Sequence, residues 1–169
     1  MPINQELRTK GKNLLKQGFA LIDESGRPRE IKEKNSVALA SKNFKFTILF
    51  LSSDKKEILK KLEERHSKNK VPVIMHSVAL YYAIESCIHF IPGIFICHDG
   101  CDKNLLKHYL KNFLREKYNE GKIKIEDSLV PMFGKKNIAD KLAKKIIRSV
   151  ESVDIQLKEK HFKKLGLLK

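Results

Sequence analysis

The sequence predicts an α/β domain with a mixed five-stranded sheet flanked by helices. Early in the chain, three short apolar runs follow one another with only polar turn segments between them, which is typical of a meander of antiparallel strands. The remainder alternates helical and strand patterns, which favours a layered domain whose helices cover a sheet. With 169 residues the chain is long enough to bury a core. We expect a single domain over residues 1–169, with its core at about 18–150, an N-terminal helix and a C-terminal helical tail.

The first part of the chain holds the N-terminal helix and the meander. Residues 4–17 carry leucines at helical spacing and predict a basic amphipathic helix. Residues 19–24 form an apolar run that ends in two acids before a glycine turn, which predicts a core strand with carboxylates at its exit. Further strands are expected over 36–40 and 44–51, on either side of a short Ser-Lys-Asn turn.

The later part of the chain alternates between the two periodicities. Pro92-Gly93 is expected to break a helix, and Asp102 is placed to cap the next one. In order, we expect a charged helix over 55–68, an apolar helix over 76–90, a strand over 94–97, a helix from Asp102 to Tyr118, an edge-like strand over 122–126 and a helix over 137–150.

The charge balance points to a polyanionic partner. Lysine and arginine number 35 against 20 acids, a net charge of +15, so nucleic acid is the first expectation. The alternative is a lysine-rich composition that serves stability. The excess is concentrated late in the chain, where the candidate phosphate contacts are Lys135, Lys136, Lys141, Lys144, Lys145 and Arg148.

Cysteine content and hydropathy indicate the compartment. Three cysteines and the lack of a secretory signal favour a reducing, cytoplasmic location over a disulfide scaffold. Residues 71–98 are poor in charge but too often interrupted by proline and polar residues for a membrane helix.

Four acids are candidate metal ligands and catalytic residues: Asp23, Glu85, Asp99 and Asp140. Asp23 and Asp99 each follow an apolar strand pattern and come shortly before a glycine. If the two strands are neighbours, the two carboxylates lie close together and repel each other unless a cation binds between them. Asp23 also fits an Asx-type turn. Glu24 is expected on the opposite face of the strand because side chains alternate.

The other two acids lie in predicted helices. Glu85 is the single charged residue within 71–98, and a carboxylate in an apolar helix needs a partner such as a metal. The alternative is a polar side of the helix that faces water or pairs with a lysine. Asp140 lies in a first helical turn, where the helix dipole alone stabilises an acid, but it is also the single acid within the basic stretch 135–148.

These residues together resemble the acidic quartet of the ribonuclease H-like superfamily, and the order of strands and helices is that of its fold. Residues 137–143 are similar to the superfamily's late Asn-x-x-Ala-Asp-x-Leu-Ala helix. More narrowly, residues 22–26 (Ile-Asp-Glu-Ser-Gly), 127–128 (Asp-Ser) and 137–140 resemble the domain of unknown function 3800 family. Pro28 stands where type 2 ribonucleases H have a glycine, which removes an amide donor.

The resulting expectation is a metal-dependent nuclease or related phosphotransferase acting on DNA or RNA. The four acids would bind two Mg²⁺ or Mn²⁺ ions. The alternatives are a non-catalytic nucleic-acid-binding module with the same fold and, less specifically, a protein–protein adaptor. A structural zinc site is disfavoured, because the spacing of Cys87, His89, Cys97, His98 and Cys101 matches no standard zinc knuckle.

Overall fold

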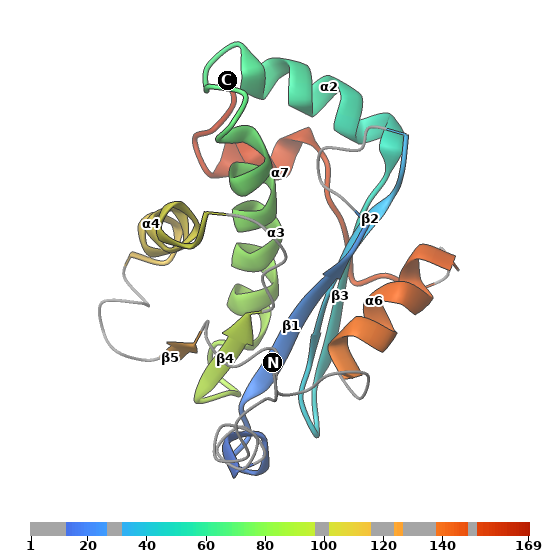
Figure 1. Ribbon diagram of the computed structural model, residues 1–169, viewed down its shortest axis with the longest axis vertical. Coiled ribbons are helices and arrows are strands. Elements are labelled where there is room, and N and C mark those ends of the chain that lie inside the picture. The colour runs from blue at the N-terminus through green and yellow to red at the C-terminus, as the bar shows by residue number, and fades with distance from the viewer. Residues whose placement is uncertain (1–12, 27–31, 97–101, 116–123, 127–137, 149–151) are drawn as a thin grey trace, which may run out of the picture.

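The computed structural model of the protein describes residues 13–26, 32–96, 102–115, 124–126, 138–148 and 152–169 (Figure 1). Its centre is one mixed sheet with the strand order β5-β4-β1-β2-β3-β6. The strands are β1 (Ala20–Ser25), β2 (Asn35–Ala40), β3 (Lys45–Phe50), β4 (Gly93–Ile96), β5 (Lys124–Glu126) and β6 (Ile155–Gln156). The α/β class with a mixed open sheet is therefore confirmed.

Strand direction divides the sheet into two parts. Strands β1, β2 and β3 are antiparallel neighbours and form the predicted meander. Strand β4 runs parallel to β1, and β5 runs parallel to β4. The sixth strand, β6, was not predicted, because two residues are too short to show alternation; it pairs in parallel with β3. The described tail is thus a short strand followed by a helix.

Five helices have described bounds: α2 (Ser52–Glu63), α3 (Val71–Cys87), α4 (Lys103–Phe113), α6 (Ile138–Arg148) and α7 (Glu159–Lys164). Helix α3 begins five residues before the predicted start, because Pro72 lies in its first turn, where a missing amide costs nothing. Asp102 caps α4 as predicted, accepting hydrogen bonds of 3.0 Å from the amides of Asn104 and Leu105. Residues 13–16 are helical, as predicted for the N-terminal helix, and the first part of that prediction lies outside the described residues.

The helices cover the two sides of the sheet unequally (Figure 1). Helices α2, α3, α4 and α7 lie on one side, where the larger apolar core is found. On the other side α6 packs across β1 and β2, over a small cluster that includes Leu21, Phe95 and Ala139. Below, these are called the α3 side and the α6 side. Within the described part of the chain, no helix has the length and apolarity needed to cross a membrane.

Candidate functional site at the end of strand β1

The alternation of β1 sends its two acids to opposite sides of the sheet. Ala20 and Ile22 belong to the α3-side core, whereas Leu21 belongs to the α6-side cluster. By the two-residue period of a strand, Asp23 therefore faces the α6 side and Glu24 faces the α3 side. This is the separation expected from the sequence.

Asp23 lies at the carboxyl end of β1, beside a parallel neighbour. Its Oδ1 accepts a hydrogen bond of 2.9 Å from the amide of Glu24, a local contact that fixes one carboxylate oxygen. Strand β4 runs beside β1, with Ile96 opposite Ile22. The two strands that precede Asp23 and Asp99 in the sequence are therefore neighbours, as a shared metal site would require. Asp99 itself lies outside the described residues.

Helix α6 approaches the sheet closely on the side that Asp23 faces. Ala139 and Ala143 are fully buried against it, and small residues at this spacing leave room for the helix backbone to touch the strands. The Ser36 hydroxyl on β2 donates a buried hydrogen bond of 2.7 Å to the carbonyl of Ala143. This contact fixes how far along the sheet α6 lies.

Asp140 lies in the first turn of α6, next to the buried Ala139. It is half-buried, and its Oδ2 accepts from the Lys144 ammonium at 2.8 Å. Asp23 and Asp140 thus lie on the same side of the sheet. Both are hard oxygen donors, which suit Mg²⁺ or Mn²⁺.

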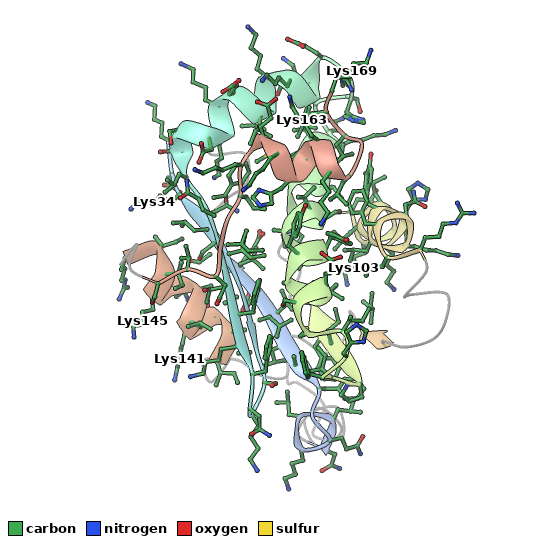
Figure 2. The ribbon with its side chains drawn as sticks, turned by 180° about the vertical axis from the view of Figure 1, so that it is seen from behind. Lys34, Lys103, Lys141, Lys145, Lys163 and Lys169 are labelled. Atoms are coloured by element: carbon green, nitrogen blue, oxygen red, sulfur yellow. The ribbon has the colours of Figure 1, made fainter. Side chains whose placement is uncertain are left out.

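The outer surface of α6 is basic. Figure 2 shows Lys141 and Lys145 pointing away from the sheet. The described basic residues of the predicted phosphate-binding set, all exposed, are Lys141, Lys144, Lys145 and Arg148. The positions Lys135 and Lys136 lie outside the described residues.

Glu85 lies in a different place from Asp23 and Asp140. It is on α3, nine residues after His76, which contacts Glu24 near the end of β1. At 1.5 Å of rise per residue, this puts Glu85 about 13 Å further along the helix axis. Its Oε1 accepts a hydrogen bond of 2.6 Å from the Tyr81 hydroxyl. Burial, and secondarily this hydrogen bond, raise the pKa of the Tyr81 phenol.

Three polar side chains that sequence reasoning did not select, those of Glu24, Asn35 and His76, lie on the α3 side. His76 and Asn35 are buried, and His76 Nδ1 lies 2.5 Å from Glu24 Oε2. Glu24 and His76 are therefore each other's partners, whereas the buried Asn35 Oδ1 has no hydrogen-bond partner in the described part of the chain. One sign of this contact was visible in the sequence. His76, like Glu85, is a polar residue within an otherwise apolar helix.

Lys55 is a second buried charge that the sequence did not reveal. It is fully buried, its ammonium donates a 2.9 Å hydrogen bond to the carbonyl of Glu33, and it lies 5.9 Å from the centre of the Phe50 ring. Helical spacing had placed Lys55 on a charged surface helix. Its burial depends on the segment before β2, which no local pattern connects to α2.

The described residues do not support a structural zinc site at the cysteines and histidines of this region. Cys87 is buried, its Sγ donates to the carbonyl of Ala83 at 3.3 Å, and burial raises the pKa of its thiol to about 12. Cys97, His98 and Cys101 lie outside the described residues. Among those described, no group of three or more histidine, cysteine, aspartate or glutamate side chains is arranged to hold a metal.

Comparison with known proteins gives no relative: no protein-family model matches the chain, and neither a curated protein nor a solved structure matches it significantly.

Proposed function

We propose that the protein is a metal-dependent nuclease, or a related phosphotransferase, that acts on nucleic acid at the α6 side of the sheet. The observation that carries the proposal is the position of Asp23 on the side of β1 that α6 covers, with Asp140 in the first turn of that helix. The exposed surface of the same helix is basic. Carboxylates for metal ions and cations for phosphates would thus come from one side of the fold.

The order of elements supports the likeness to the ribonuclease H-like superfamily. An antiparallel meander, two helices, a strand parallel to the first one, a helix, a further parallel strand and a last helix follow one another in the described chain. This order is the one expected from the resemblance. We therefore propose that the chain is related to the ribonuclease H-like superfamily and, within it, to the domain of unknown function 3800 family.

The described donors fit a hard divalent ion. We assign Asp23 and Asp140 as metal ligands, with Asp99 expected beside them on sequence grounds. Glu85 is left out of the proposed set because it lies about 13 Å along α3 from the residue that contacts Glu24. Divalent ions bound there would activate a water molecule and stabilise the leaving oxygen of a phosphodiester.

The chain's own residues would prepare the site in two ways. The Glu24 amide donates to one oxygen of Asp23 and would hold the carboxylate in a fixed orientation at the end of β1. Lys144 neutralises Asp140 in the absence of metal and is long enough to turn toward a phosphate instead. Lys141, Lys145 and Arg148 would bind the nucleic-acid backbone without reading its sequence.

The test is cleavage of labelled single- and double-stranded DNA and RNA with Mg²⁺, Mn²⁺ or EDTA. We expect cleavage with metal, and its loss in Asp23→Asn and Asp140→Asn, each with unchanged circular dichroism and polyanion binding. Glu63→Gln, an exposed acid on α2, is the matched control and should cleave normally. Cleavage by Asp23→Asn at the wild-type rate would contradict the assignment. Metal-indifferent binding without cleavage would instead favour the non-catalytic binding module.

A further inference from the structure

Three phenylalanines form a row at the end of the molecule where α3 ends and β2 turns into β3 (Figure 1). The Phe44 ring contacts both of the others. Its centre is 6.4 Å from that of Phe46, with 5° between the ring planes, and 6.2 Å from that of Phe90, with 25° between the planes. Such distances and angles are those of stacked rings. Below, Phe44, Phe46 and Phe90 are called the aromatic row.

The aromatic row is exposed at one end. Phe90 is 75% exposed, more than any other large apolar side chain in the described part of the chain. Phe44 and Phe46 are half-buried and pack against the α3-side core. Single exposed apolar side chains are common on proteins, but here the exposed ring continues a stack of two others. Because the core holds the inner rings in place, the row presents a preformed aromatic surface to the solvent.

The surroundings of the aromatic row are basic. The two segments that carry it, residues 41–46 and 88–92, contain Lys42, Lys45 and His89 and no acid. All three of these side chains are exposed. Lys45 lies between two members of the row that face the α3 side, so strand alternation turns it toward the α6 side. Protein–protein interfaces have few lysines, whereas surfaces that bind single-stranded nucleic acid combine basic side chains with aromatic rings.

We propose that the aromatic row is a base-stacking surface for single-stranded nucleic acid, with Phe90 as the ring on which a base lies. Every base has a π face, so stacking on phenylalanine binds nucleic acid without reading its sequence. In a duplex the bases already stack on one another, so the row favours single strands. The inference rests on the proposed function for its partner, nucleic acid, and goes further by naming the single-stranded form and a second contact surface.

The strand register places the aromatic row near the proposed carboxylate site but on the other side of the sheet. Phe46 pairs with Leu39, and Leu39 pairs with Ile22. Ile22 comes directly before Asp23. Neighbouring strands are about 4.8 Å apart, so the backbone of Phe46 lies roughly 10 Å from that of β1. A single strand on the basic surface of α6 would reach the row by passing round the turn between β2 and β3, where Lys42 lies.

The first experiment uses the fluorescence of Phe90→Trp, because the chain contains no tryptophan. A base that stacks on the indole quenches its emission. In EDTA, which removes divalent ions, we expect saturable quenching by a single-stranded oligonucleotide of about 16 nucleotides and little by the duplex of the same sequence. Glu63→Trp is the control and should not be quenched, since position 63 is exposed on α2, at the other end of α3 (Figure 1).

Affinity measurements separate stacking from apolar packing and from charge. In anisotropy titrations with the same single strand, Phe90→Leu keeps an apolar side chain but should bind at least about fivefold more weakly, whereas Phe90→Tyr should bind within about twofold of the wild type. The slope of log affinity against log salt should be the same in all three proteins, since neither substitution removes a charge. Because Phe90 is exposed, the midpoint of urea denaturation should not change.

The results also distinguish this surface from the proposed active site. Asp23→Asn should bind the single strand at least as tightly as the wild type. Single-strand binding through Phe90 by a protein that cleaves nothing would support the aromatic surface and contradict the proposed nuclease. Wild-type affinity in Phe90→Leu, or unquenched emission of Phe90→Trp at saturation, would overturn the surface even if the protein cleaves. A blue shift of that emission with rising protein concentration, without nucleic acid, would also overturn it, because a second copy of the chain would then cover Phe90.

Discussion

The two sides of the sheet differ in what covers them. On the α3 side, α3 is buried almost all round, and large side chains from four helices fill a wide core. On the α6 side, α6 approaches through two alanines over a small cluster, and its outer surface is charged. The comparison suggests a division of labour, in which the α3 side contributes most of the stability and the α6 side presents groups that bind. The following substitutions test that division.

The largest effect is expected for Leu80→Ala in the middle of α3. Leu80 is fully buried, so its truncation loses transfer free energy and leaves a cavity, and it should lower the free energy of unfolding by about 2–5 kcal/mol. Urea denaturation followed by circular dichroism measures the change. Ile138→Ala on α6, where the side chain is 44% exposed, is the control and should cost less than about 1 kcal/mol. If the two variants lost the same free energy of unfolding, the α3 side would not contribute more stability than the α6 side, contrary to the proposal.

The comparison also shows how far sequence patterns reach. The two-residue alternation of 19–24 was enough to predict that Asp23 and Glu24 face opposite sides. Apolar runs located the strands β1 to β4, and the alternation of polar residues with isoleucine over 122–126 located β5. The contact between Glu24 and His76 could not be predicted, because it depends on where α3 crosses the sheet. The distance of Glu85 from the end of β1 depends on the same nonlocal geometry. A lone charge in an apolar helix indicates a partner, and here one partner is the Tyr81 hydroxyl on the preceding turn.

An intermediate effect is expected for Ala143→Leu on α6. Ala143 is fully buried and its carbonyl accepts the Ser36 hydrogen bond, so a larger side chain would push the helix from the strands and strain that contact. Overpacking of this kind should cost about 1–3 kcal/mol, measured by urea denaturation. Lys141→Leu adds the same side chain on the exposed side of the helix and should change stability by less than about 0.5 kcal/mol. If Ala143→Leu were neutral, the close approach of α6 would not be needed for the fold.

The smallest effect on stability, and the most specific effect on binding, is expected for Lys144→Ala. Lys144 pairs with Asp140 at 2.8 Å across one helical turn, and Lys163 on α7 pairs with Glu159 at 3.0 Å in the same arrangement. Both lysine side chains are about half exposed, so either substitution should cost no more than about 0.5 kcal/mol. The two variants are therefore matched in stability and differ in the helix that carries the charge.

The binding measurement separates these two lysines. In fluorescence anisotropy titrations at several salt concentrations, loss of one phosphate contact should lower the slope of log affinity against log salt by about 0.7–0.9. We expect this reduction in Lys144→Ala and not in Lys163→Ala, although both variants lower the net charge by the same amount. A nonspecific effect of the +15 net charge would weaken both variants equally. A reduction confined to Lys144 would therefore place the nucleic acid on α6, beside the carboxylates of Asp23 and Asp140, and not spread over the whole basic surface.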